Sequence, residues 1–327
     1  MENNVLISAK GLKKYFPISS FLGGKKKYIR AVDDIDLEIY KGETFGLVGE
    51  SGCGKSTLGK TLIRMYEPTA GKIYYKGEDI TDRKLNKIKS VQNSMQIIFQ
   101  DPYSSLNPFW NVEEILSEPL KNLKIKKGDM YESIKLILNK VGMSEDDLIK
   151  FPYEFSGGQR QRIGIARALL VNPEFIMCDE PIAALDVSIQ AQVVNLLQDL
   201  QKEFGLTYLF TAHDLSMVRY ISNRIGVMYL GSLVEIANSK SLFKKPLHPY
   251  TKALLSAVPS PDPSKKNINE KVKISGEVSQ VFADSNACRF APRCIYKTKI
   301  CEKECPKLRE LEGGHRVACH NAESINS

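Results

Sequence analysis

The order of hydrophobic and polar positions predicts strands that alternate with helices along most of the chain. Short alternating runs at 5–7 and 29–39 are typical of antiparallel strands, and a loop rich in Gly, Lys and Ser is expected between them, at 17–27. Residues 44–48 form a short apolar run that is typical of a buried strand. A helical pattern at 55–65 follows it, after a Gly-rich turn.

The same alternation continues downstream. Apolar runs predict strands at 97–99, 175–178, 206–212 and 225–229. Periodicity near 3.6 predicts helices at 131–141, 159–170, 190–204 and 215–222. Pro102, Pro108 and Pro119 are expected to break the stretch before the first of these helices. Strands that alternate with helices predict an α/β fold with a mostly parallel sheet.

The alternation fades after about residue 233, which suggests a change of domain. We expect a large α/β domain at 1–235, with a helical subdomain at about 101–170. The Pro-Ser-Pro-Asp-Pro run at 259–263 is typical of a linker. A C-terminal extension at 236–327 is then expected to end in a separate small cysteine-rich module.

Length and charge exclude few classes of protein. The chain has 327 residues and a formal net charge of +8, partly from short lysine runs that are typical of solvated loops. We therefore expect no nucleic-acid partner. No run reaches the roughly 18 apolar residues of a membrane span, and the N-terminus lacks the apolar core of a secretory signal. The chain is expected in the cytoplasm, reaching a membrane only through partners.

The strongest motif is GESGCGKS at 49–56, which fits the phosphate loop G-x-x-x-x-G-K-[ST] at every fixed position. Its glycines let the backbone wrap closely around phosphates, and the N–H groups at the start of the helix favour an anion. Lys55 is expected to reach the β- and γ-phosphates of ATP, Ser56 to ligate Mg²⁺ and Thr57 to support the α-phosphate. The candidate nucleotide-binding residues are Gly49, Glu50, Ser51, Gly52, Cys53, Gly54, Lys55, Ser56 and Thr57.

A phosphate loop needs a carboxylate at the end of a second strand to hold Mg²⁺. The apolar run at 175–178 ends in Asp179 and Glu180, and Pro181 stops the strand. Asp179 fits the magnesium site. Glu180 is placed to polarise a water for attack on the γ-phosphate, which makes it the candidate general base.

The run Ser156, Gly157, Gly158 and Gln159 precedes a long amphipathic helix. Ser is a favourable N-cap, and the two glycines leave the helix end open to an anion. Together with the phosphate loop and the Asp-Glu strand end, in this order and spacing, this run resembles the signature set of ABC-transporter ATPases. The resemblance covers nearly the whole chain. It implies that the signature run contacts ATP held by the phosphate loop of an opposite subunit.

The resemblance also assigns roles to single residues. Gln100, after the strand at 97–99, matches the glutamine that senses Mg²⁺ and the permease. His213 matches the switch histidine that contacts the γ-phosphate. Asp186 matches the D-loop aspartate, although Ala183 stands where the family commonly has serine. With Glu180, Gln100 and His213 make up the candidate catalytic set, and Gln100 joins Ser56 and Asp179 as a candidate magnesium ligand.

The aromatic residue that stacks on adenine has three candidates. Phe16 fits the usual spacing in the family and is our assignment. Tyr15 and Tyr28 are close in sequence, and the insertion between them leaves both as alternatives.

Longer runs resemble the ATP-binding subunits of oligopeptide and dipeptide importers in particular. They lie at 100–108, 186–193, 248–251 and 317–320. Members of that subfamily work as one of two different ATPase subunits bound to two integral-membrane permeases, and an extracytoplasmic peptide-binding protein feeds the pair. The chain resembles the second sister subunit, often called the F-type. The implied location is peripheral, on the cytoplasmic face of the cell membrane.

Other functions share part of this pattern. Importers of nickel and other small solutes have the same architecture, so the substrate rests on resemblance alone. A soluble ABC ATPase that remodels ribosomes or DNA would suit the basic charge. However, such proteins usually carry two cassettes or a long coiled coil, and the chain has one cassette and no sustained heptads. An exporter ATPase would normally lack the peptide-importer tail.

Five of the seven cysteines lie in the last 40 residues or so, at 288–319. Clustered thiols in a cytoplasmic chain are more often metal ligands than disulfides, and a short tail poor in apolar residues needs a staple to fold. The sequence predicts a [4Fe–4S] cluster, which is held by four cysteines, and the resemblance points the same way. The candidate ligands are Cys288, Cys294, Cys301 and Cys319.

Two alternatives stay open for this metal centre. Zinc is the main one, and His315 and His320 could contribute ligands to it. However, structural zinc sites favour closer cysteine pairs than the first two gaps here provide. The second alternative concerns Cys305, which precedes a proline as one ferredoxin ligand does, and which could replace one of the four.

Overall fold

The computed structural model describes residues 4–18, 27–82, 89–213, 215–257 and 286–326. These residues divide into two compact units, and each is described by itself. Unit 1 comprises Met1–Asn4, Tyr40–Thr44 and Asp82–Ala212. Unit 2 comprises Val5–Ile39, Phe45–Thr81 and His213–Ser327.

Unit 1 is built on three parallel strands in the order β8, β7, β6. They are β6 (Met95–Ile98), β7 (Phe175–Asp179) and β8 (Thr207–Ala212). Every residue of β7 and β8 is buried, as expected where both faces of a parallel sheet are covered. This explains why the sequence shows continuous apolar runs here rather than alternation, and the predicted strands are confirmed.

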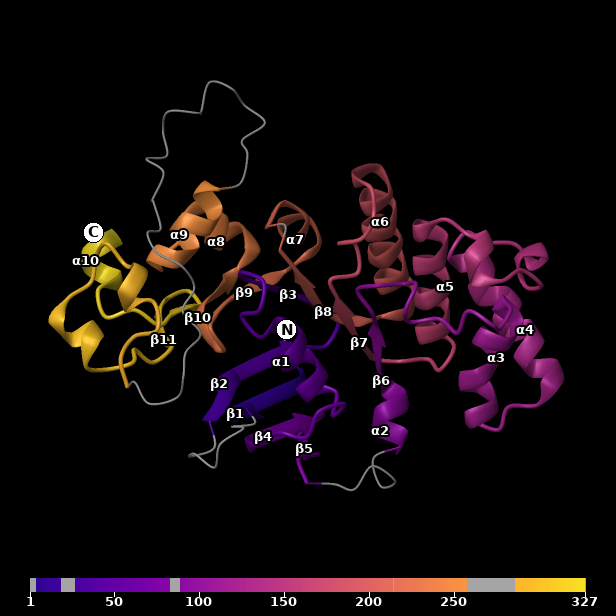
Figure 1. Ribbon diagram of the computed structural model, residues 1–327, viewed down its shortest axis with the longest axis horizontal. Helices are drawn as coiled ribbons and strands as arrows, with labels where there is room; N and C mark the ends of the chain where they lie inside the picture. The colour runs from indigo at the N-terminus through magenta and orange to yellow at the C-terminus, as the bar shows by residue number, and fades with distance from the viewer. Residues whose placement is uncertain (1–3, 19–26, 83–88, 214, 258–285, 327) are drawn as a thin grey trace. The chain divides into compact units, whose positions relative to one another are not determined.

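The helices of unit 1 are α2 (Lys89–Ser94), α3 (Val112–Asn122), α4 (Lys127–Lys140), α5 (Gly157–Leu169) and α6 (Val187–Phe204), with short 3₁₀ turns at Glu145–Asp147 and Pro152–Glu154. In Figure 1, α3, α4 and α5 lie together in the magenta part of the chain. The buried face of α6 includes Val193, Val194 and Leu197, and the Tyr208 hydroxyl of β8 donates to the Leu197 carbonyl at 3.0 Å. The three predicted helices of this unit are confirmed, each within four residues at its ends.

One prediction about unit 1 is wrong. Pro119 was expected to break the chain, but it lies inside α3. A capping box starts this helix, because the Asn111 side chain accepts from the Glu114 N–H and the Glu114 carboxylate accepts from the Asn111 N–H. The buried side chains of Ile115 and Leu116 then anchor it. Packing and capping together outweigh the single hydrogen bond that the proline removes.

Unit 2 contains an antiparallel sheet in the order β2, β1, β4, β5. Its strands are β1 (Val5–Ile18), β2 (Lys27–Tyr40), β4 (Ala70–Tyr75) and β5 (Glu78–Asp79). The two predicted strands are confirmed, but β1 is much longer than the run at 5–7. Its end at Ile18 takes up the start of the expected loop, and residues 19–26 of that loop lie outside the described residues.

The second sheet of unit 2 has the order β11, β12, β10, β9, β3. Its strands are β3 (Thr44–Val48), β9 (Arg224–Tyr229), β10 (Ser232–Asn238), β11 (Arg309–Glu312) and β12 (His315–Val317). β3 pairs with β9 in parallel, whereas β9, β10, β12 and β11 pair antiparallel in turn. The helices are α1 (Lys55–Leu62), α7 (Leu215–Ile221), α8 (Ser239–Lys244), α9 (Pro249–Ser256) and α10 (Ala322–Asn326), with 3₁₀ turns at Ala291–Arg293 and Lys299–Glu302.

The C-terminal tail shares the sheet of unit 2. Its strand β12 pairs with β10, so that Glu235 lies opposite Val317 and the tail covers what would otherwise be a sheet edge. Figure 1 shows this yellow segment beside β10. Leu247, Val317 and Ala322 form a small buried cluster where the tail meets the chain before it. The predicted linker at 259–263 lies outside the described residues.

Among the described residues, no helix is long and apolar enough to cross a membrane.

Candidate nucleotide site and signature elements

The phosphate loop lies in unit 2, between β3 and α1. Gly54 adopts a φ of 107° at the N-cap of α1, a conformation that favours glycine. A Cβ on Gly54 would stand 2.0 Å from the Ala31 carbonyl oxygen, and a Cβ on Gly49 would stand 2.2 Å from that of Met228. Both glycines therefore let the loop approach neighbouring backbone so closely that no other residue fits. The predicted strand, loop and helix are confirmed.

Lys55 is buried, and its ammonium group points back into the loop. Its Nζ donates to the carbonyl oxygen of Gly49 at 2.9 Å and to that of Glu50 at 3.3 Å. The positive charge is thus held inside the curve of the loop, at the start of α1, where the helix dipole also favours an anion. Loop backbone and lysine together fit a phosphate group.

Other loop residues have different surroundings. Ser56 and Thr57 lie half-buried in the first turn of α1, whereas Ser51 and Gly52 are exposed. The Cys53 side chain is buried, and burial raises the pKa of its thiol, which keeps the sulfur neutral beside the loop.

Asp179 and Glu180 stand at the end of β7 in unit 1, both buried. Glu180 has a φ of 47°, which a non-glycine residue adopts at a cost. Its N–H donates to the Thr211 hydroxyl at 3.0 Å, and the same Oγ1 lies 3.4 Å from Oδ1 of Asp179. Thr211 of the neighbouring strand therefore fixes the turn that presents both carboxylates, a role that no local sequence pattern indicates.

The signature run forms the start of α5. Ser156 is the N-cap, its hydroxyl accepts from the Gln159 N–H at 3.3 Å, and the Gln159 side chain accepts from the Ser156 N–H at 3.0 Å. Ser156 and Gln159 are exposed, so this helix end is open as predicted. Gly158 is buried, and a Cβ on it would stand 2.5 Å from Cγ2 of Ile189.

That contact brings the signature run against the D-loop segment within unit 1. Asp186 is the exposed N-cap of α6, and its carbonyl accepts from the N–H groups of Ile189 and Gln190 at 2.9 Å each. Gly158 is therefore required by packing, a reason that the sequence alone did not suggest. Its predicted role in leaving the helix end open to an anion stays a prediction.

Gln100 and His213 are both exposed at strand ends. Gln100 follows β6 by two residues, and His213 comes directly after β8. Each position is the one expected from the order of strands and motifs.

The aromatic candidates on β1 point to opposite faces of the strand, because successive strand residues alternate. The Tyr15 hydroxyl hydrogen-bonds to Asp33, and burial raises the pKa of Tyr15 to about 12, with that hydrogen bond adding to the shift. Phe16 is half-buried, packs edge-on against Tyr66 and has the Lys14 ammonium 5.0 Å from its ring centroid. Tyr15 is thus engaged with Asp33, and Phe16 with Tyr66 and Lys14. The assignment of Phe16 to adenine stacking stays a prediction.

The tail cysteines share one neighbourhood of unit 2. The Cys288 N–H donates to the Cys301 carbonyl at 2.8 Å, and Sγ of Cys301 lies 3.3 Å from the Thr298 hydroxyl. Burial raises the pKa of Cys288 to about 12 and that of Cys319 to about 11. The charge of Cys301 adds to both shifts, and that of Cys294 adds to the second.

Within the described residues, no group of three or more His, Cys, Asp or Glu side chains is arranged to hold a metal ion. The four predicted ligands are therefore near one another but do not converge. Burial without a cation favours neutral thiols, whereas metal ligands are thiolates. The [4Fe–4S] cluster and its zinc alternative stay predictions.

Comparison with known proteins agrees with this geometry. The family model described as ABC transporter matches residues 32–183, and the one described as oligopeptide/dipeptide transporter, C-terminal region, matches residues 234–301. The solved structure of cbiO1 from Clostridium perfringens, part of an ABC transporter complex, is similar with a TM-score of 0.64 and 27% identity, covering 74% of this chain and 91% of its own. A dimeric ATP-binding cassette, MJ0796 bound to ADP and Pi, has a TM-score of 0.64 at 26% identity over 72% and 99% of the two chains. These likenesses define the class, an ATPase of the ABC-transporter kind.

Relatives at higher identity narrow the class. The oligopeptide transport ATP-binding protein OppF of Bacillus subtilis is 50% identical, over 97% of each chain. The dipeptide transport ATP-binding protein DppF of Haemophilus influenzae is 42% identical, over 98% of each chain. The chain belongs to the family of ATP-binding subunits of oligopeptide and dipeptide ABC transporters.

Proposed function

We propose that this chain hydrolyses ATP to energise the import of peptides through an ABC transporter. The observation that carries the proposal is similarity along nearly the whole chain, tail included, to proteins named as oligopeptide and dipeptide transport ATP-binding proteins. The phosphate loop supports it, because Lys55 and the close-packed glycines form a cradle that fits phosphate groups.

ATP and Mg²⁺ are the cofactors of this family, and we propose which residues of this chain serve them. Lys55 and the loop N–H groups bind the phosphates, while Ser56, Asp179 and Gln100 serve the metal. When bound, Mg²⁺ supplies charge neutralisation at the β- and γ-phosphates. Glu180 accepts a proton from the attacking water, and His213 contacts the γ-phosphate. Phe16 stacks on adenine.

The partners follow from family membership. An ABC ATPase of a peptide importer works as a dimer on membrane permeases, and we propose a heterodimer with a sister ATPase subunit, this chain being the F-type one. Ser156 to Gln159 and Asp186 then face the nucleotide of the partner subunit. Two permeases and an extracytoplasmic peptide-binding protein complete the complex, which holds the chain on the cytoplasmic face of the membrane. Nucleic acid is not among the partners.

We propose that the permease contacts the segment at 101–110. Its aromatic side chains are unusually open, with Phe109 86% and Tyr103 61% exposed. Large exposed aromatics in a short run are typical of an interaction surface. The Arg160 guanidinium lies 3.7 Å from the centroid of the Tyr103 ring and ties this segment to the start of α5, just after the signature run.

Isolation of the native complex from membranes tests the proposal. We expect the tagged chain to bring down two permeases, a second ATPase and a peptide-binding protein, and the complex in vesicles to accumulate labelled peptides only with ATP. Uptake of nickel but not of peptides would favour the small-solute alternative. A chain that stays off membranes and bound to ribosomes would contradict the importer.

We also propose that the tail holds a metal centre through Cys288, Cys294, Cys301 and Cys319, most simply a [4Fe–4S] cluster. Support comes from the number of thiols and from the hydrogen bond that the Cys288 N–H donates to the Cys301 carbonyl. The side chains must turn toward one another to bind it. Chain purified without oxygen should be brown and contain about four irons. Stoichiometric zinc in a colourless protein would contradict the cluster but keep the ligands, and the absence of both metals would contradict the site.

A further inference from the structure

Glu50 is a carboxylate inside a loop that fits anions. It is the first variable residue of the phosphate loop, and a negative charge there repels phosphate unless it is neutralised or turned away. Its backbone N–H and its side-chain carboxylate each contact a residue that lies far along the chain. Its N–H donates to the Tyr250 hydroxyl at 2.9 Å, and its carboxylate pairs with Arg293.

The Arg293 contact is a two-pronged pair. Its Nη1 donates to Oε2 of Glu50 at 3.0 Å and its Nη2 donates to Oε1 at 3.2 Å. Such a fork fixes the direction of a carboxylate as well as its charge. The Arg293 side chain is only 11% exposed, and the guanidinium lies 5.8 Å from the centroid of the Tyr229 ring. The Arg293 side of the pair is therefore shielded from solvent, and removal of one partner would leave a poorly solvated charge.

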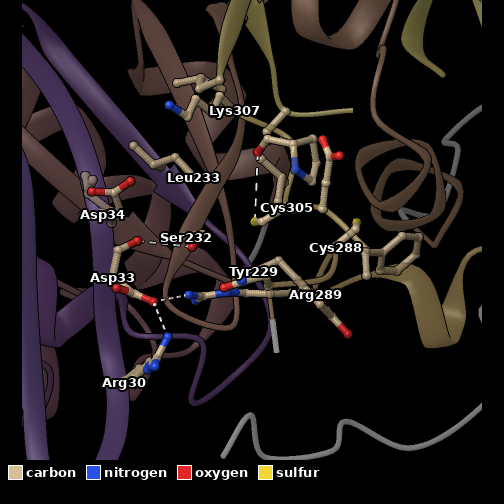
Figure 2. Close-up of a pocket in the computed structure, with 18 of the residues that line it drawn as sticks. Arg30, Asp33, Asp34, Tyr229, Ser232, Leu233, Cys288, Arg289, Cys305 and Lys307 are labelled. Atoms are coloured by element: carbon tan, nitrogen blue, oxygen red, sulfur yellow. Dashed lines mark hydrogen bonds and ion pairs between the residues drawn. The ribbon is translucent and has the colours of Figure 1, made fainter. Parts of the chain in front are cut away.

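The segment that carries Arg293 is anchored to the same part of unit 2 by its other side chains. The Phe290 ring packs against Tyr229, Tyr250 and His248, with centroids 5.3 to 5.6 Å apart. The Arg289 guanidinium donates to Asp33 and to the Leu230 carbonyl. Figure 2 shows the Arg289 guanidinium directly against the Asp33 carboxylate. Both residues line a cavity of about 630 Å³.

The turn that Arg289 contacts also touches the phosphate loop. Gly231, the residue after Leu230, donates its N–H to the Cys53 carbonyl at 2.8 Å. The segment at 289–293 thus reaches the loop at two points: through Glu50, and through the turn that holds Cys53. A part of the chain outside the ABC-transporter match, but inside the peptide-transporter C-terminal match, supports the nucleotide loop.

We infer that Arg293 is a positioning residue for ATP binding, which neutralises Glu50 and holds its carboxylate away from the phosphates. The inference rests on the proposed function of the phosphate loop. Loss of Arg293 leaves an unpaired carboxylate beside the phosphates, so affinity for ATP falls. When both charges are removed, no unpaired carboxylate stands beside the phosphates. The affinity for ATP should then return, although the ion pair is gone. If Arg293 merely supported the fold, removal of the Glu50 charge would not restore the affinity for ATP.

Equilibrium binding of a fluorescent ATP analogue to the full chain tests this with five variants. Arg293→Gln should raise the Kd roughly tenfold, the scale of one unpaired charge near an anionic ligand. The Kd of Arg293→Lys should lie between that of Arg293→Gln and that of wild type, because lysine keeps the charge but cannot make the two-pronged hydrogen bond. Arg293→Gln combined with Glu50→Gln should bind within about twofold of Glu50→Gln alone. Arg309→Gln, which breaks an exposed forked pair with Glu323 in the same tail, should change nothing.

In the assembled transporter, Arg293→Gln should raise the KM for ATP with kcat nearly unchanged, because the lost interaction affects binding and not the chemical step. The inference is overturned if Arg293→Gln binds as wild type does, or if the double variant binds as weakly as Arg293→Gln. Failure of wild type to bind ATP would instead overturn the proposed function, so the two failures are distinguishable.

Discussion

At the scale of single residues, the end of β7 concentrates the chemistry of unit 1. Glu180 is held in a left-handed conformation by the Thr211 hydroxyl, and this costs backbone energy that a solvated strand end would not need. Such strain is commonly kept where a side chain must point in one direction. It is consistent with the proposed role of Glu180 as general base.

Glu180→Gln should keep ATP binding and lower turnover by a factor on the order of 10² or more, because the amide cannot accept the proton. Turnover of the assembled transporter and binding by the isolated chain measure the two effects. Lys55→Ala is the contrasting variant and should weaken binding itself, because the buried ammonium inside the loop is lost. Near-normal turnover of Glu180→Gln would contradict the assignment.

At the scale of elements, the start of α5 is exposed, capped by Ser156 and packed through Gly158 against the first turn of α6. A capped helix start leaves N–H groups for an anion, and we propose that the signature run uses them.

Ser156→Arg should abolish hydrolysis by the assembled transporter and leave ATP binding by the isolated chain intact, because the long side chain blocks the open helix end. Ser144→Arg is a control at another exposed helix start in unit 1, where the Asp147 carboxylate accepts from the Ser144 N–H. It should leave hydrolysis intact. Equal loss of hydrolysis in both variants would point to a folding defect.

The buried histidine at the start of α9 should make the stability of the folded chain depend on pH. His248 is fully buried, and its Nδ1 accepts from the Tyr250 N–H at 3.0 Å. Burial lowers the pKa of His248 to about 4, although the charge of Glu235 opposes this. The unfolded chain therefore binds more protons than the folded chain between about pH 4 and 6.5, and stability falls as the pH is lowered through that range.

Lowering the pH from 7 to 5 should lower the free energy of unfolding by about 2 kcal/mol through the titration of His248. His248→Asn keeps a cap acceptor and does not titrate, so its loss over the same range should be smaller by about that amount. Urea unfolding of both proteins at the two pH values measures the difference. Equal losses of unfolding free energy in wild type and His248→Asn would show that His248 is not the titrating group.

At the scale of the whole molecule, the chain is one subunit of a transporter complex. We propose that the signature run contacts ATP held by another subunit, in which case an isolated chain holds a phosphate loop without the signature that completes its site. The dimeric cassette MJ0796 has the same fold.

We therefore expect the isolated chain to bind one ATP and hydrolyse it slowly, and turnover to rise when the sister subunit is added. Titration of the sister subunit against a fixed amount of this chain, with ATPase activity as readout, measures this. Ser156→Arg in this chain, titrated in the same way, is the control and should stay inactive. Turnover that depends on neither the partner nor protein concentration would contradict the proposal.

The α/β class, most of the strands and helices and the nucleotide motifs could be predicted from the sequence. These depend on short-range patterns, because apolar runs indicate buried strands and the phosphate loop is eight consecutive residues. The distant residues that support these elements became visible in the folded chain alone. Thr211 lies 31 residues from Glu180, and Arg293 lies 243 residues from Glu50. Such pairs are set by which strands and loops the topology brings together, and local periodicity carries no record of that. Pro119 looked like a break because the local pattern does not show the burial of Ile115 and Leu116, which anchors α3 together with its capping box.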